Sequence, residues 1–297
     1  MAALFSPPPA ATPISTGGAS AFESFRLRLP RASPVSPRAD ELSGECDQEH
    51  ATRRLRALAA QEPVYAPNAD YIETVRSRVQ FSRSRSNGRF RHATNSTRKQ
   101  TQVQTRGMTD AWRAKIASWF RELGEAFDMR SETVAIATNY LDRYLSRRSC
   151  ESVDLQLAAT ASIFLASKVE EQRHFRTGDL VSLCGGLFSR ADLRLMELEL
   201  MMTLGWLLNP PTIHSNVHHL VALVDSDARD RRSLVDRALK YADKAREDYA
   251  MLRYPPSLAA VAAVVCALRT LDAPFEETAK FVVRRGVRFR TFTRVVA

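Results

Sequence analysis

Apolar residues recur at helical spacing over two successive stretches of the chain, on either side of Asn209-Pro210-Pro211. The first stretch predicts five helices, over residues 110–127, 131–145, 155–168, 177–184 and 189–204. The second predicts helices over 212–224, 229–254, 257–271 and 273–285. Proline removes a backbone donor and disfavours helix at the preceding residue, so the Pro-Pro pair predicts a hinge. The pattern therefore predicts an all-α protein with two helical domains.

Polar residues and glycines indicate where these helices begin and end. Thr109 or Asp110, Ser131 and Ser189 are of the N-cap type, and Gly205 stands where a helix is expected to stop. The third helix of each stretch carries small residues almost all round. A helix without a polar face is expected to be central, with neighbours close on every side. The two stretches therefore resemble a weak internal repeat whose second copy ends early.

Composition divides the rest of the chain. Residues 1–47 are rich in Ser-Pro and Thr-Pro pairs and poor in large apolar groups, which predicts a disordered tail. A short helical pattern follows within 48–72, with Ala51, Leu55, Leu58 and Ala59 on one face and a stop at Pro63. Residues 73–106 form an Arg/Ser-rich insert without periodicity. The predicted divisions are 1–47, 48–72, 73–106, 107–208 and 209–297, the last with a basic end.

The formal net charge of +10 is unevenly distributed. Residues 73–106 carry +8 and residues 278–297 carry +6, whereas residues 107–277 carry −3. The insert is open to three interpretations: a solvated linker, a segment for nuclear import or an acidic partner, or a nucleic-acid-binding segment. Aromatic residues that could stack on bases are limited to Phe81 and Phe90, so nucleic acid is not the expected partner.

Several classes of protein are excluded by missing patterns. The four cysteines form no CxxC pair, which speaks against a zinc module and a disulfide scaffold. No apolar run of about 18 residues and no secretory signal is present, so a protein that is neither exported nor in a membrane is expected. His214 and His218 have a spacing able to hold a metal, but no Glu or Cys completes the set. With no Gly-rich phosphate loop, G-x-S-x-G or paired carboxylates, we expect no enzyme activity, no cofactor and no metal.

Four motifs of the first domain, in order along the chain, resemble those of the cyclin box. They are Trp112–Trp119, similar to M-R-x-I-L-x-x-W; Asn139–Ser146, similar to N-Y-[LI]-D-R-[FY]-L-S; Ala166–Glu171, similar to A-S-K-x-E-E; and Met196-Glu197 with Leu204-Gly205-Trp206, similar to M-E…L-x-[FW]. Residues 55–72 and 248–260 are similar to the segment before a cyclin box and to the second-box signature. The resemblance implies a five-helix first cyclin box followed by a truncated second one.

The resemblance also implies a function. Cyclins are regulatory subunits that bind a cyclin-dependent serine/threonine kinase and push its αC helix inward, so that the catalysis belongs to the partner. Lys168 and Glu197 match the two kinase-binding positions of the family. A lysine offers donors to backbone carbonyls and a carboxylate accepts backbone N–H groups, which suits both to charge-assisted contacts. A role in cell-cycle control, in the nucleus, the cytoplasm or both, is the corresponding expectation.

Other motif residues have implied roles. Arg113 and Asp142 match a structural ion pair of the family. A docking groove for Arg-x-Leu segments of substrates or inhibitors is implied at five positions: Trp112, Ile116, Trp119, Glu122 and Gln156. Core packing is the alternative for the aromatic members. Lys115 departs from the family pattern, because a charge there opposes an apolar peptide anchor unless the lysine stem alone contacts it.

Two alternatives of another class stay open. One is a cyclin-fold transcription factor or nucleic-acid-binding scaffold that activates no kinase, although a zinc ribbon of the kind expected at its start is missing. The other is a kinase-free interaction module that keeps only the fold. The subclass also stays open between A/B-like and D-like cyclins, since the Asn139–Arg143 motif suits both.

Overall fold

The computed structural model describes residues 44–73, 109–148, 150, 152–224 and 228–270, and every regular element within these ranges is a helix. The prediction of an all-α protein is confirmed. Two compact units are present: unit 1 holds the described residues from Pro67 to Leu208, and unit 2 holds those up to Ala66 and from Asn209 onward. The predicted tail up to residue 43, nearly all of the basic insert and the helix over 273–285 lie outside the described residues.

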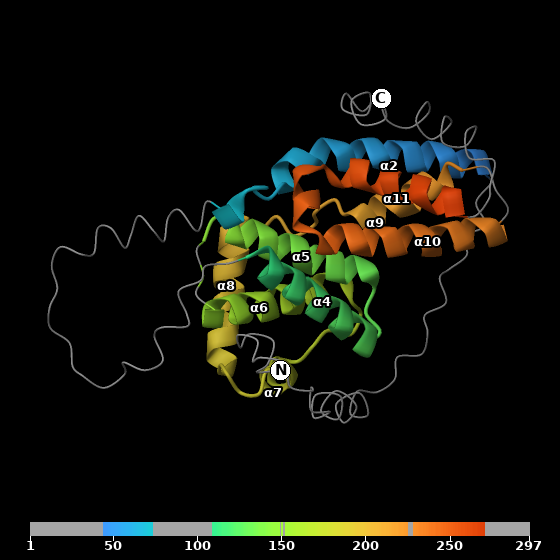
Figure 1. Ribbon diagram of the computed structural model, residues 1–297. Helices are drawn as coiled ribbons and strands as arrows, with labels where there is room; N and C mark the ends of the chain where they lie inside the picture. The colour runs from blue at the N-terminus through green and yellow to red at the C-terminus, as the bar shows by residue number, and fades with distance from the viewer. Residues whose placement is uncertain (1–43, 74–108, 149, 151, 225–227, 271–297) are drawn as a thin grey trace, which may run out of the picture. The chain divides into compact units, whose positions relative to one another are not determined.

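Unit 1 contains the five helices predicted for the first stretch. They are α4 (Asp110–Ala126), α5 (Ser131–Leu145), α6 (Ser152–Glu170), α7 (Thr177–Leu183) and α8 (Arg190–Leu204). The expected central position of the third helix is confirmed, because α6 packs against both α5 and α8 (Figure 1). Its alanines Ala158, Ala159 and Ala161 are completely buried, which lets the neighbouring helices approach closely.

The helix ends of unit 1 follow the predicted caps with one exception. Thr109 accepts a hydrogen bond from the Trp112 N–H, Ser189 forms a reciprocal capping box with Asp192, and Gly205 ends α8 in the left-handed conformation. Ser131 was predicted as a cap and is instead the first residue of α5. That prediction was wrong because a residue far away in the sequence caps α5.

The carboxylate that caps α5 is Glu171, directly after α6. Arg130 is the N-cap residue of α5 but offers no side-chain acceptor. Glu171 Oε1 accepts from the Arg130 backbone N–H at 2.9 Å and from the Thr133 hydroxyl. A carboxylate at a helix N-terminus also interacts favourably with the positive end of the helix dipole. The last residue of the A-S-K-x-E-E motif thus joins the end of α6 to the beginning of α5.

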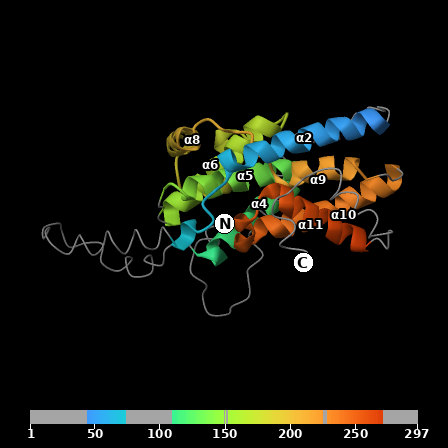
Figure 2. The same ribbon diagram turned by 90° about the horizontal axis from the view of Figure 1, so that it is seen from above.

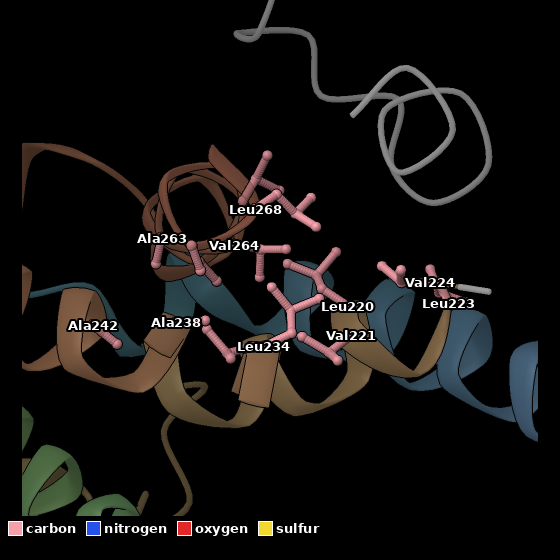
Figure 3. Close-up of a cluster of buried hydrophobic side chains, with 14 of the residues drawn as sticks. Leu220, Val221, Leu223, Val224, Leu234, Ala238, Ala242, Ala263, Val264 and Leu268 are labelled. Carbon is pink, nitrogen blue, oxygen red and sulfur yellow. The ribbon is translucent and has the colours of Figure 1, made fainter. Parts of the chain in front are cut away.

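Unit 2 contains α2 (Gly44–Tyr65), α9 (Ile213–Ala222), α10 (Ala228–Glu247), a short 3₁₀ helix (Tyr249–Arg253) and α11 (Pro256–Thr270). The small-residue helix α11 packs against α2, α9 and α10, which run side by side in Figures 1 and 2. Figure 3 shows Leu220, Leu234 and Val264 pointing toward one another from three of these helices. From α2, Ala51 and Leu55 join the same core, each only 2% exposed.

Two predicted helix boundaries of unit 2 were wrong. Helix α2 begins at Gly44 and continues through Pro63 to Tyr65, because near the end of a long helix a missing N–H costs a single hydrogen bond. The segment predicted as one helix over 229–254 divides after Glu247. Asp248 accepts from the Ala250 N–H at 2.9 Å and starts the 3₁₀ helix, since a short carboxylate competes with the helical backbone pattern.

A carboxylate of α2 holds the beginning of α11. Glu62 Oε1 accepts from the Ser257 backbone N–H at 2.6 Å, and Oε2 accepts from the Ser257 hydroxyl at 2.9 Å. Burial raises the pKa of Glu62, and the hydrogen bonds from Ser257 only partly oppose that increase. These two hydrogen bonds, which we call the Glu62 tether, therefore join residues far apart in sequence. Their net contribution to the free energy of unfolding is modest.

We expect Glu62→Ala to loosen the first turn of α11. Loss of a helix cap costs about 1 to 2 kcal/mol, so the free energy of opening measured by hydrogen exchange across α11 should fall by that amount. Glu49→Ala is the matched control, because Glu49 lies on the same helix and its partner among the described residues is the exposed Arg53. Equal exchange in the two variants would contradict the tether.

Candidate functional site

The motif Asn139–Ser146 lies on α5 and connects several parts of unit 1. Asp142 accepts from Arg113 through both carboxylate oxygens, at 2.9 Å from Nε and 2.8 Å from Nη2. The Tyr71 hydroxyl donates to the same carboxylate at 2.9 Å. Burial disfavours the charged guanidinium, but the Asp142 carboxylate outweighs burial and raises the pKa of Arg113. Arg113 and Asp142 are only 3% and 2% exposed, so the arrangement is a buried, hydrogen-bonded ion pair.

Two neighbours of Asp142 hold other segments and were not identified from sequence. Arg143 donates to the carbonyls of Leu204 and Leu207 at 3.0 and 2.8 Å, which satisfies acceptors at the C-terminal end of α8. The Ser146 hydroxyl accepts from the Asn68 backbone N–H at 2.8 Å. Asp142, Arg143 and Ser146, at the C-terminal end of α5 and its cap, thus bind α4, the end of α8 and the segment before α4, respectively.

Lys168 and Glu197, the two expected kinase-binding residues, are brought together from α6 and α8. Lys168 Nζ lies 2.5 Å from Glu197 Oε1, and 4.0 Å from the centre of the Phe164 ring. The Lys168 side chain is 34% exposed and that of Glu197 is 11% exposed. Val169, the next residue, is 39% exposed. The pair therefore forms a partly accessible charged site beside an apolar side chain, with donors and an acceptor within reach of a partner.

The five residues expected to form a peptide groove differ in accessibility. Ile116, Trp119 and Gln156 are 2%, 3% and 7% exposed, whereas Trp112 is half-buried and Glu122 is exposed. The structure therefore places most of the apolar contribution of this set in the core. The indole N–H of Trp119 is buried and has no acceptor within the described residues.

Lys115 lies over the half-buried member of that set. Its ammonium nitrogen is 5.1 Å from the centre of the Trp112 ring, within the range of a cation–π contact. A cation over this half-buried indole opposes the binding of an apolar peptide side chain to the same ring. The departure from the family pattern thus has a structural consequence at this position.

The two histidines with metal-ligand spacing have different environments. His214 is 1% exposed, and its Nε2 lies 3.0 Å from Asp243 Oδ1 on α10, whereas His218 is exposed. Arg246 donates to the same carboxylate oxygen at 3.3 Å. His214 therefore joins α9 to α10, and among the described residues no group of three His, Cys, Asp or Glu side chains is placed to bind a metal ion.

The neighbouring His219 makes unit 2 sensitive to acid. Partial burial and the positive charge of Arg54 lower the pKa of His219 to about 4. Between pH 4 and 6.5 the unfolded chain, in which a histidine has a pKa near 6.5, binds more protons than the folded chain. The contribution of His219 to the free energy of unfolding is therefore fully present above about pH 6.5 and is lost as the pH falls toward 4. We expect the urea concentration at which unit 2 unfolds, measured by hydrogen exchange in α9, to decrease as the pH is lowered from 6.5 to 4. His219→Gln should weaken that pH dependence, whereas His174→Gln in unit 1 should leave it unchanged.

Residues 78–209 match the family model of the cyclin N-terminal domain. This matched range includes all five helices of unit 1. Helix α2 lies before the matched range, and α9, α10 and α11 follow it.

Plant cyclins are among the relatives of this chain. Cyclin-A3-3 of Arabidopsis thaliana is 27% identical over 161 residues, which is 54% of this chain and 49% of the relative. G2/mitotic-specific cyclin-2 of Medicago sativa is 29% identical over 165 residues, 56% of this chain and 49% of the relative. The chain thus spans about half the length of these two relatives.

A solved structure shares the fold. The viral cyclin from herpesvirus saimiri superposes with a TM-score of 0.50 at 18% sequence identity, covering 60% of this chain and 85% of the viral chain. The expected cyclin fold is therefore confirmed. Within the described residues, no helix is both long and apolar enough to cross a bilayer.

Proposed function

We propose that this chain is a cyclin, a regulatory subunit that binds and activates a cyclin-dependent serine/threonine kinase. The observation that carries the proposal is the Lys168–Glu197 pair, which joins two motifs 29 residues apart into one partly exposed site. The match of residues 78–209 to the cyclin N-terminal domain supports it, as does the name of the Medicago relative, a G2/mitotic-specific cyclin. The phosphoryl transfer belongs to the kinase, and the role of this chain is to hold the kinase in its active conformation.

The ion pair between Lys168 and Glu197 leaves hydrogen-bonding groups available to a partner. Lys168 has three N–H donors, of which one is used by Glu197, and a carboxylate has several acceptor positions. Backbone carbonyls of a partner can thus bind the lysine and backbone N–H groups the glutamate while the pair remains intact. The pair holds both side chains in place before binding, which reduces the entropy lost when the complex forms.

Kinase activation tests the proposal. Purified full-length chain is mixed with each of a panel of cyclin-free cyclin-dependent kinases, and phosphate transfer to histone H1 is measured. The expected result is stimulation of at least one kinase together with a stable complex in size-exclusion chromatography. Binding without stimulation would favour an interaction module, and neither binding nor stimulation across the panel would overturn the proposal.

Substrate choice is the second part of the proposal. We infer that Trp112 and Glu122 contribute the accessible part of a site for Arg-x-Leu peptides, with Lys115 weakening it. Lys115→Ile removes the cation from the Trp112 ring, so affinity for a fluorescent Arg-x-Leu peptide should rise roughly tenfold, equivalent to about 1.4 kcal/mol. A peptide with Ala in place of Arg and Leu is the control. Unchanged anisotropy for both peptides with both proteins would contradict docking here.

A further inference from the structure

Helix α8 carries apolar side chains on two opposite faces. The inner face consists of Leu193, Met196, Leu200 and Leu204, each no more than 8% exposed. The outer face consists of Leu195, Leu198 and Met202, which are 66%, 46% and 66% exposed. We call these three residues the outer row. At about 100° per residue they fall within roughly 60° of one another, opposite the inner face.

The outer row has the spacing of a coiled-coil seam. Ala191, Leu195, Leu198 and Met202 follow one another at intervals of four, three and four residues, the pattern of alternating d and a positions. Figures 1 and 2 show α8 at an edge of unit 1. Glu197, in the proposed kinase site, lies about 130° around the helix from this row, so the two surfaces face different directions.

Charges beside the row select its partner and orientation. Arg194 occupies a g position, and Asp192 and Glu199 occupy e positions. Glu199 also accepts from the Tyr144 hydroxyl at 3.1 Å and lies 3.7 Å from Arg148 Nε, while its side chain stays 45% exposed. In a parallel pair of identical helices, Arg194 of one copy lies next to Glu199 of the other, and the same contact recurs by symmetry. In an antiparallel pair, Asp192 and Glu199 of the two copies would face each other and repel. The row and its flanking charges are therefore self-complementary in the parallel arrangement.

We propose that α8 is a self-association surface through which two copies of this chain pair in parallel. The seam is only about two heptads long, so the dimer is expected to be weak, with a dissociation constant in the micromolar range. This inference goes beyond the proposed kinase regulation and does not depend on it. A kinase at Lys168–Glu197 and a second copy at the outer row use different sides of α8.

Sedimentation velocity of the full chain over a wide concentration range tests the proposal. The wild type is expected to shift from monomer toward dimer, and Leu195→Glu with Met202→Glu to weaken the dimer at least about tenfold. Leu187→Glu is the matched control, because Leu187 is 51% exposed but lies before α8. Far-UV circular dichroism of each variant verifies folding. A wild type that stays monomeric, or a control that weakens the dimer equally, overturns the proposal.

Charge reversal and cross-linking test the orientation. Arg194→Glu should weaken the dimer, and adding Glu199→Arg should restore it, because the reversed charges attract again in the parallel pair. Met202→Cys should form a disulfide between the two copies under mild oxidation, since only parallel helices place this position beside itself. Efficient cross-linking only between Leu195→Cys and Met202→Cys, without either variant linking to itself, would show an antiparallel pair and refute this model.

Histone phosphorylation by the variants separates the outer row from the kinase site. The Leu195→Glu, Met202→Glu protein should stimulate a responsive kinase as the wild type does. If stimulation is lost while the wild type is monomeric, the row belongs to the kinase and self-association is refuted. If no kinase responds to any protein but the dimer is present, only the proposed function fails.

Discussion

Arg113→Met is expected to destabilise unit 1 by roughly 3 to 5 kcal/mol, because it leaves the buried Asp142 carboxylate without its cation. Asp142 is only 2% exposed, so water cannot replace the guanidinium. The Tyr71 hydroxyl would remain as a donor, but one neutral hydrogen bond does not compensate a buried charge. Since small domains are stable by only about 5 to 15 kcal/mol, such a loss would leave unit 1 marginal.

Tryptophan fluorescence during urea unfolding measures this effect selectively. The three tryptophans, Trp112, Trp119 and Trp206, all lie in unit 1, so their emission follows this unit within the full chain. The midpoint for Arg113→Met should fall sharply without a change in slope. Tyr71→Phe is the matched control and should cost only about 1 kcal/mol, because the ion pair remains.

A double-mutant cycle separates the ion pair from general packing. Arg113→Met combined with Asp142→Leu removes both charges, and replacing a buried pair by apolar residues is often neutral or stabilising. The double variant should therefore be more stable than either single variant. Losses that simply add, or single variants with the midpoint of the wild type, would show that the pair does not stabilise unit 1.

The fold was largely predictable because its helices have clear periodicity and local caps. Ser189 with Asp192 and Gly205 are signals within a few residues of the helix ends they define. The errors occurred where distant residues decide the outcome. Glu171 caps α5 from 41 residues away, and no local pattern at Arg130 or Ser131 contains that information.

The geometry of the candidate site could not be predicted from the sequence. The cyclin resemblance selected Lys168 and Glu197, yet nothing in their spacing shows that they form an ion pair with each other. Similarly, helical spacing along α8 does not distinguish a core leucine from an exposed one, whereas the structure divides its leucines between a core face and an exposed row. The burial of a helix face depends on which other helices pack against it, and local sequence periodicity does not show that packing.

Replacing both Lys168 and Glu197 by alanine is expected to weaken kinase binding by about 2 to 5 kcal/mol, or roughly 30-fold to several thousandfold. The same substitutions should hardly change the stability of the free protein, because partly exposed ion pairs contribute about 0 to 1 kcal/mol. Isothermal titration calorimetry with a responsive kinase and urea unfolding of the free chain give the two measurements. A partner-binding role requires a large loss of kinase affinity in the titration and a small change in the free energy of unfolding.

The charge-swapped variant Lys168→Glu, Glu197→Lys distinguishes an internal role of the pair from a contact with the kinase. The swap re-forms the ion pair across α6 and α8, so the fold of unit 1 is expected to be retained. It also places an acceptor where the kinase carbonyls need a donor, and a donor where its N–H groups need an acceptor. Binding should therefore be lost as completely as in the double alanine variant.

A surface ion pair elsewhere in unit 1 provides the control. Arg121 and Glu125 on α4 are 2.9 Å apart, with side chains 39% and 66% exposed, and their double alanine variant removes the same number of charges. Kinase affinity of this control should equal that of the wild type. If the charge swap binds the kinase normally, the pair serves only to hold α6 against α8, and the kinase must bind this chain through other residues.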